Sequence, residues 1–172
     1  VPSEGALAVH TKAVELMRSE RTEHVRKWKV IGFFPNWKEA DSDTTYPPEH
    51  ERDFSAKHRG WYGDLEWRDW NTLRSEDHTI DFFRALEDGA NDVFDCPGTA
   101  YAYAEFASEQ RRETDIELRT PHQCRLWLND KPLLNEAAKC ETLVRQGNNT
   151  LLLKISTNGD GCQASVQLTA KG

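Results

Sequence analysis

The segment RGWYGDLEWRDW, residues 59–70, combines aromatic and charged side chains at a density that fits sugar recognition. Sugars have apolar C–H faces and polar rims, so a site for them pairs flat aromatic rings with side chains that bind hydroxyl groups. The candidate ligand-binding residues of this segment are Arg59, Trp61, Tyr62, Asp64 and Trp70. The alternative is that the aromatic rings fill the hydrophobic core and the loop beneath it, which is what we expect for Trp28 and Trp67.

Two tryptophans outside that segment, Trp37 and Trp127, are further candidates for sugar binding. In CRLWLND, residues 124–130, apolar and polar positions alternate as in a β-strand. Leu126 and Leu128 are expected to point into the core, and Trp127 to point away from it near a turn. Trp127 then needs either a covering segment, which would be the N-terminal helix or a long loop, or a ligand on its ring.

Two acidic turns could hold calcium. They are EADSDTT at residues 39–45 and NGDG at residues 158–161. Ca²⁺ prefers carboxylate and carbonyl oxygens, and the candidate ligands are Asp41, Asp43 and Asp160. The first turn is not an EF-hand loop, because the twelfth position from Asp41 is Arg52 rather than glutamate. The alternative is that both segments are solvated loops.

The sequence contains none of the common catalytic motifs. G-x-S-x-G, H-E-x-x-H and a glycine-rich phosphate loop are missing, and the six histidines have no metal-like spacing. Glu66 with Asp69, or Asp41 with Asp43, could form a glycosidase pair, which requires a separation of about 5–10 Å across a cleft. With 29 acidic residues in the chain, close pairs of carboxylates occur by chance. We therefore expect no catalysis by this domain.

Composition narrows the class of protein. The chain has 172 residues, of which 10% are aromatic, and this aromatic content argues against disorder despite the 30% of charged residues. The formal net charge of -7 disfavours nucleic acid as a partner. No stretch approaches the roughly 20 apolar residues of a membrane-spanning helix, so we expect no membrane insertion.

Four cysteines, Cys96, Cys124, Cys140 and Cys162, are spaced 28, 16 and 22 residues apart. No C-x-x-C motif occurs, so a zinc ribbon is not indicated. Four cysteines allow three disulfide pairings. The sequence is compatible both with at least one disulfide and with buried free thiols.

Apolar spacings of three and four residues predict one amphipathic helix over residues 5–24. Residues 36–64 lack periodicity and predict a long loop. Alternation predicts strands at 64–70 and most clearly at 99–107, where Tyr101 and Tyr103 share one face and Ala100, Ala102 and Ala104 the other. Residues 79–86 are ambiguous, and a strand is favoured. Further short strands follow at intervals of about ten residues, which is typical of a β-sandwich.

The stretches CRLWLNDKPLL and LVRQGNNTLLLKIS resemble the C-terminal half of galactose-binding-like jelly-roll domains. In those domains a W-L-N-G-like turn precedes a G-x-N-x-L-L-x-K-V strand. VRKWKVIGFFPN and TTYPPE resemble the N-terminal half of a variant of the same domain. Asp130 replaces the usual glycine of the turn, and Asp tolerates the left-handed backbone needed there. PHQC at residues 121–124 replaces an acidic segment, so no ligand role of those acids transfers.

The resemblance implies an all-β jelly-roll β-sandwich at residues 25–172, with a long ordered loop. Residues 1–24 would be an N-terminal helix, either an appendage or the end of a preceding domain. Similar domains are accessory parts of large extracytoplasmic bacterial proteins and often hold a structural Ca²⁺. We therefore expect an extracytoplasmic, non-catalytic carbohydrate-binding module whose partners are a polysaccharide or oligosaccharide and neighbouring domains. The alternatives are a structural or protein-interaction module and a small glycoside hydrolase.

Overall fold

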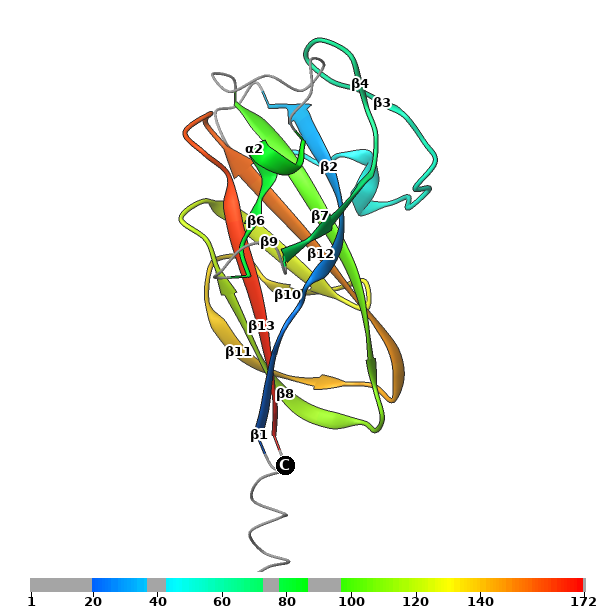
Figure 1. Cartoon of the computed structure of the whole chain (residues 1–172), viewed down its shortest axis with the longest axis vertical. Coiled ribbons are helices and arrows are strands. Elements are labelled where there is room, and N and C mark those ends of the chain that lie inside the picture. Colours follow the sequence, from blue (N-terminus) through cyan, green and yellow to red (C-terminus); the bar gives the residue numbers. More distant parts are fainter. Residues whose placement is uncertain (1–19, 37–42, 73–77, 87–96, 172) are drawn as a thin grey trace, which may run out of the picture.

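The computed structural model describes residues 20–36, 43–72, 78–86 and 97–171. Within these ranges the chain is almost entirely β-structure, and two antiparallel sheets pack face to face as a jelly-roll-like sandwich (Figure 1). The predicted fold class is therefore confirmed. No helix in the described ranges is long and apolar enough to span a membrane.

The two sheets divide the strands between them. Sheet I contains, in spatial order, β1 (Glu20–His24), β13 (Gln163–Lys171), β8 (Arg112–Arg119) and β11 (Lys139–Val144), and β6 (Ile80–Asp81) also pairs with β13. Sheet II contains, in order, β10 (Lys131–Leu134), β9 (Gln123–Leu128), β12 (Gly147–Thr157), β7 (Gly98–Ser108), β2 (Lys27–Pro35) and β5 (Arg68–Asn71). The hairpin of β3 (His58–Arg59) and β4 (Asp64–Leu65) forms a separate pair, and the short helices are η1 (Pro47–Glu49), a 3-10 turn, and α2 (Phe82–Ala85).

The main core lies between the two sheets and is formed by the inward side chains of both. Leu126 and Leu128 are buried in this core, as the alternation in β9 predicts. In β7 the alanines at positions 100, 102 and 104 belong to the same core, whereas Tyr101 and Tyr103 face outward. Trp28 is also part of the core. The period of two therefore assigned the faces of these strands correctly.

A second hydrophobic cluster covers the outer face of sheet II. Its buried members are Ile31, Phe34, Leu65, Tyr101, Tyr103 and Leu152, and Tyr46, Phe54, Trp67 and Trp127 pack against it. The loop between β2 and β3 contributes Tyr46 and Phe54 to this cluster, and its residues Glu49 and Arg52 line a depression together with Trp127. Trp127 thus points away from the main core, as predicted, and packs against this cluster, and sugar binding by its ring stays a prediction. Trp67 packs in this second cluster with Phe54 of the loop, which agrees with its predicted structural role.

The hairpin between β9 and β10 has the predicted left-handed turn. Asn129 and Asp130 have φ values of 49° and 66°, and Lys131 pairs with Leu128 directly across the turn. Both central residues of a type I′ turn need positive φ, which asparagine and aspartate tolerate. The replacement of glycine by Asp130 therefore preserves the hairpin.

The predicted helix over residues 5–24 is wrong at its C-terminal end. Residues 20–24 form β1, which pairs with β13 from Glu20 opposite Lys171 to His24 opposite Gln167. Backbone hydrogen bonds to an existing strand outweigh the helical spacing of apolar side chains, because propensity yields to tertiary context. The first strand of the sandwich thus begins before the predicted boundary at residue 25, and residues 5–19 lie outside the described ranges.

Two predicted strands are only partly strand. In residues 79–86 the strand ends at Asp81, whose Oδ1 accepts a hydrogen bond from Arg84 N over 3.2 Å and caps helix α2. Side-chain capping by aspartate favours a helix start at this point. The segment 64–70 is split into β4 and the beginning of β5, with Glu66 and Trp67 between them.

Three cysteines are free thiols. Cys124 and Cys162 are buried and Cys140 is partly buried. Burial raises the pKa of the Cys124 thiol to about 11 and that of Cys162 well above its ordinary value. Of the two possibilities that the spacing left open, free thiols are observed for these residues, and Cys96 lies outside the described ranges.

Candidate functional site

A buried ion pair anchors the loop that covers sheet II. Lys154, on β12, donates from Nζ to Glu49 Oε2 over 2.9 Å and to the Thr44 carbonyl over 2.5 Å. The lysine side chain is fully buried and that of Glu49 is 9% exposed. A buried charge of this kind requires a partner of opposite charge. The pair therefore ties the TTYPPE segment to the outer face of the sheet.

Two tyrosines complete this anchor. Tyr101 donates its hydroxyl hydrogen to Glu49 Oε2 over 2.5 Å, and Tyr46 N donates to the same oxygen over 3.1 Å. Burial, together with the hydrogen bond to Glu49, raises the pKa of Tyr101, so the phenol stays protonated. Tyr46 also donates from its hydroxyl to the Pro35 carbonyl over 2.7 Å. Two of the segments on which the family resemblance rests, TTYPPE and LVRQGNNTLLLKIS, thus meet in space through residues 105 positions apart.

The β3–β4 hairpin gathers four of the predicted ligand-binding residues. Arg59 and Asp64 are paired across the hairpin, and Gly60 N donates to Gly63 O over 2.7 Å to close the turn. Trp61 is partly buried, and its Nε1 donates to the Pro97 carbonyl over 3.2 Å. Tyr62 is 69% exposed at the tip. Trp61 therefore fastens the hairpin to the sandwich, and Tyr62 is the aromatic ring that faces solvent.

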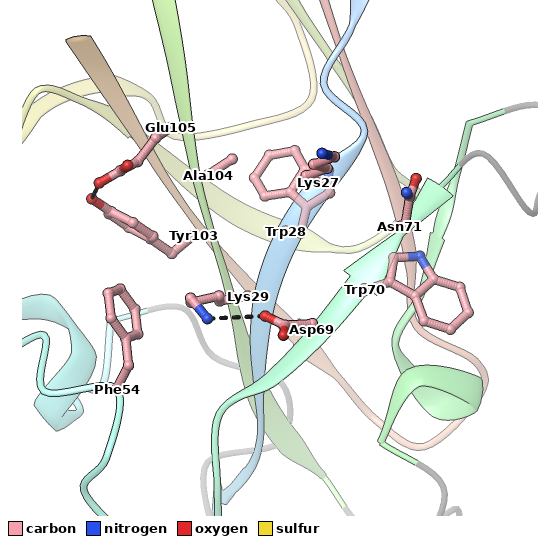
Figure 2. Close-up of a pocket in the computed structure, with 10 residues that line it drawn as sticks. All are labelled: Lys27, Trp28, Lys29, Phe54, Asp69, Trp70, Asn71, Tyr103, Ala104 and Glu105. Carbon is pink, nitrogen blue, oxygen red and sulfur yellow. Dashed lines mark hydrogen bonds and ion pairs between the residues drawn. The ribbon is translucent and has the colours of Figure 1, made fainter.

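A groove of about 800 Å³ runs over β2, β5 and β7 (Figure 2). Phe54 and Tyr103 form its aromatic side, with ring centroids 5.0 Å apart. Phe54 comes from the covering loop, which the buried ion pair holds in place. The full lining comprises Lys27, Trp28, Lys29, Phe54, Asp69, Trp70, Asn71, Tyr103, Ala104 and Glu105.

Charged groups line the other side of the groove. Lys29 Nζ donates to Asp69 Oδ1 over 2.9 Å, and the same ammonium lies 5.4 Å from the centroid of the Phe54 ring. Glu105 Oε1 accepts from the Tyr103 hydroxyl over 2.9 Å. Burial and this hydrogen bond raise the pKa of Tyr103. Lys27 is exposed beside them. The groove thus combines aromatic rings, hydrogen-bond donors and carboxylate acceptors.

The other predicted aromatic residues are dispersed. Trp70 lines the groove, but it pairs with core residue Trp28 across β2 and β5 and points away from Phe54 and Tyr103 in Figure 2. Trp127 lies in a different depression, beside an ion pair between Arg52 and Asp130. Trp37 lies outside the described ranges. The predicted set is therefore not one site.

The predicted calcium ligands are not gathered in the described ranges. Asp43 forms an ion pair with Arg125, and Asp160 is exposed on the turn before β13. No group of three or more His, Cys, Asp or Glu side chains in those ranges is arranged to hold a metal. Asp41 lies outside them. Calcium binding stays a prediction that rests on the acidic turns and on the resemblance.

The candidate carboxylate pair Glu66 and Asp69 is engaged by lysines. Glu66 lies 2.9 Å from Lys57 Nζ, and this hydrogen bond and charge lower the pKa of Glu66. Asp69 is held by Lys29 in the groove. A general acid needs a raised pKa instead. The geometry therefore lends no support to Glu66 as a proton donor.

Comparison with known proteins identifies the fold and nothing finer. No protein-family model and no curated protein matches the sequence. A β-glucuronidase from an uncultured Clostridium species aligns with a TM-score of 0.53 and 11% identity over 89% of this chain and 29% of that one. The Faecalibacterium prausnitzii β-glucuronidase aligns with a TM-score of 0.53 and 9% identity over 81% and 21%. A β-glucosidase from Kluyveromyces marxianus aligns with a TM-score of 0.48 and 10% identity over 84% and 16%.

The chain spans less than a third of the length of these solved structures. Identities this low indicate a shared β-sandwich alone, since one fold hosts many functions. The assignment to galactose-binding-like domains stays a prediction.

Sequence reasoning missed most of the groove. Phe54, Lys27, Lys29 and Glu105 were not among the predicted ligand-binding residues, although they line it. Part of the signal was present. Lys27 and Lys29 alternate with Trp28, and Tyr103 and Glu105 alternate with alanines, so each pair shares the outer face of its strand. The pairing of β2 with β7, which places Lys29 opposite Tyr103, could not be read from either strand alone.

Proposed function

We propose that this chain is a non-catalytic carbohydrate-binding module and that the groove over β2, β5 and β7 is its sugar site. The observation that carries the proposal is the groove itself, in which the rings of Phe54 and Tyr103 lie beside the Lys29–Asp69 pair and Glu105. Two of the structural relatives, each with a TM-score of 0.53, are β-glucuronidases by name, which supports a carbohydrate-related role.

In this proposal a sugar ring lies against Phe54 while its hydroxyl groups bind the charged side chains. Lysine ammonium groups donate to hydroxyl oxygens, and the carboxylates of Asp69 and Glu105 accept from hydroxyl hydrogens. Because each hydroxyl both donates and accepts, a rim of mixed sign suits a polyhydroxylated ligand better than a simple ion. Extracytoplasmic location and a host protein with further domains belong to the same proposal.

Glycan microarrays and affinity electrophoresis in plant and algal polysaccharides test this function. We expect retardation by at least one polysaccharide, weakened about tenfold by Lys27→Ala or Asp69→Ala, since each removes a polar contact of the site. Tyr62→Ala is the matched control, because Tyr62 is exposed at the hairpin tip and does not line the groove.

Two outcomes count against the proposal. If no glycan binds at millimolar concentration, the proposed carbohydrate-binding function is wrong. Loss of binding in Tyr62→Ala with unchanged binding in the two groove variants would move the site to the β3–β4 hairpin. Thermal unfolding of each variant separates lost binding from lost folding.

A further inference from the structure

Three turns that are distant in sequence each bring one cation to the same depression. Arg111 lies in the turn between β7 and β8, Lys131 follows the turn between β9 and β10, and Arg145 lies in the turn between β11 and β12. These turns lie toward one side of the sandwich in Figure 1, and the three side chains line a depression of about 430 Å³. This feature is separate from the proposed sugar groove, with which it shares no lining residue.

The charged side chains that line this depression are all positive, whereas the whole chain has a net negative charge. The chain carries 29 acidic and 22 basic residues, yet no carboxylate lines the depression. None of the three cations forms an ion pair with a carboxylate of the described ranges, although Arg145 Nε donates to the Asn148 carbonyl over 2.9 Å. All three side chains are exposed. They therefore form a local positive patch that remains available to an anionic partner.

The floor of the depression is aliphatic. It contains Leu128, Pro132, Leu133 and Leu143, and no aromatic residue lines it. Leu143 is 45% exposed and is one of two exposed large hydrophobic residues in the described ranges. Sugar sites favour flat aromatic rings, whereas an aliphatic floor fits the branched apolar side chains of a peptide.

A hydrogen-bond network holds two of the turns rigidly together. Asn129 Nδ2 donates to Asn149 Oδ1 over 2.9 Å, and Asn149 Nδ2 donates to the Arg145 carbonyl over 2.9 Å. Asn129 Oδ1 accepts from Thr150 N over 2.9 Å. Lys131 and Arg145 are thus attached to a preorganised frame, which lowers the entropic cost of binding.

From this arrangement we propose that the three-turn depression binds a short acidic peptide segment of a partner protein. Carboxylates of the peptide pair with Arg111, Lys131 and Arg145, and its apolar side chains pack on Leu143 and Leu133. Arginine recognises carboxylates in a bidentate manner, which orients the peptide. The module would then hold a glycan on one surface and a protein segment on another.

Fluorescence anisotropy with a labelled short peptide, in which leucine alternates with glutamate or aspartate, tests this proposal. We expect binding that weakens from about 0.05 to 0.5 M salt, because exposed charges are screened over this range. Arg111→Glu combined with Lys131→Glu is expected to weaken binding about tenfold or more. Leu143→Gln is expected to weaken it without changing the salt dependence, because it removes apolar contact and no charge.

Arg26→Glu combined with Lys57→Glu is the matched control, since it makes the same change in net charge on exposed side chains that line neither the depression nor the proposed sugar groove. We expect it to leave peptide affinity unchanged. The proposal is overturned if this control weakens binding as much as the test pair, or if peptides with lysine or glutamine in place of the acids bind equally well. Equal binding of a polygalacturonate oligomer, with the same sensitivity to Leu143→Gln, would assign the site to an acidic glycan instead.

Discussion

Lys154 and Glu49 form an ion pair at 2.9 Å, although the lysine side chain has no exposed surface. The pair joins the core strand β12 to the 3-10 turn of the covering loop. One residue therefore belongs to the sandwich and the other to the segment that carries Phe54 into the groove. We therefore expect loss of this contact to displace Phe54 and to weaken the proposed sugar site.

Glu49→Gln is expected to lower the free energy of unfolding by about 3–5 kcal/mol, because it leaves the buried lysine charge without a counter-charge. Urea denaturation measures this loss, and limited proteolysis within residues 43–57 reports release of the loop. Adding Lys154→Met to Glu49→Gln should recover part of the stability. Lys57→Gln, which breaks the exposed pair with Glu66, should change little. If Glu49→Gln and Lys57→Gln lower the free energy of unfolding equally, this interpretation is contradicted.

Thr114→Val is expected to leave stability unchanged or to raise it by about 1 kcal/mol. Thr114 is 3% exposed, and its hydroxyl oxygen has no hydrogen-bond partner in the structure. Replacing an unpaired buried polar group by an apolar group of the same shape removes a desolvation cost. Denaturant midpoints of the two proteins provide the measurement.

Thr99→Val is the control for that prediction. The Thr99 hydroxyl lies 3.0 Å from Ser156 Oγ and accepts from Asn36 Nδ2 over 3.3 Å. Its loss is expected to cost about 1–2 kcal/mol. If Thr114→Val destabilises as much as Thr99→Val, an ordered water satisfies the Thr114 hydroxyl.

Stability is expected to fall as the pH drops below about 6.5, the ordinary pKa of histidine. Burial and the neighbouring His78, Arg26 and Arg119 lower the pKa of His24, and its ring stacks on His78 at 4.4 Å. The unfolded chain therefore takes up a proton at a higher pH than the folded chain does. Folding is favoured above pH 6.5 and loses stability as the pH falls toward the folded-state pKa.

Urea midpoints from pH 8 to pH 5 check this dependence, a range that lies above the titration of ordinary carboxylates. His24→Gln should flatten the curve. The pKa of His122 is also lowered by burial, so this residue contributes in the same direction. Any pH dependence that remains in His24→Gln should therefore disappear in the double variant His24→Gln/His122→Gln. An unchanged pH dependence in that double variant would refute the assignment to these histidines.

Three thiols are expected to titrate with a disulfide reagent in a Cys96→Ser variant unfolded in guanidinium, because Cys124, Cys140 and Cys162 are free. In the folded protein Cys140 should react first. It is the only partly exposed one of the three, and Cys162 is fully buried with a strongly raised pKa. Fewer than three thiols after unfolding would reveal a disulfide among them.

The alternation of side chains allowed much of the sandwich to be predicted. Side chains alternate between the two faces of every strand. This period of two places Leu126 and Leu128 inward and Trp127 outward. It also places Tyr101 and Tyr103 on the face opposite the alanines of β7. The Asn129–Asp130 turn followed in the same way, because few residues accept two successive left-handed positions. These features depend on residues within a few positions of one another.

The amino-acid sequence by itself thus determined which faces of the strands are buried, where the hairpin turns, and that the chain is an all-β sandwich. Only the tertiary structure decided which outward-facing residues become neighbours. Strand order places Lys29 beside Tyr103, and the buried contact of Glu49 with Lys154 carries Phe54 onto the same surface. Such neighbours are brought together by pairings between distant segments, and local periodicity contains no information about those pairings. The same reason explains why residues 20–24 form a strand along β13 despite a helical pattern.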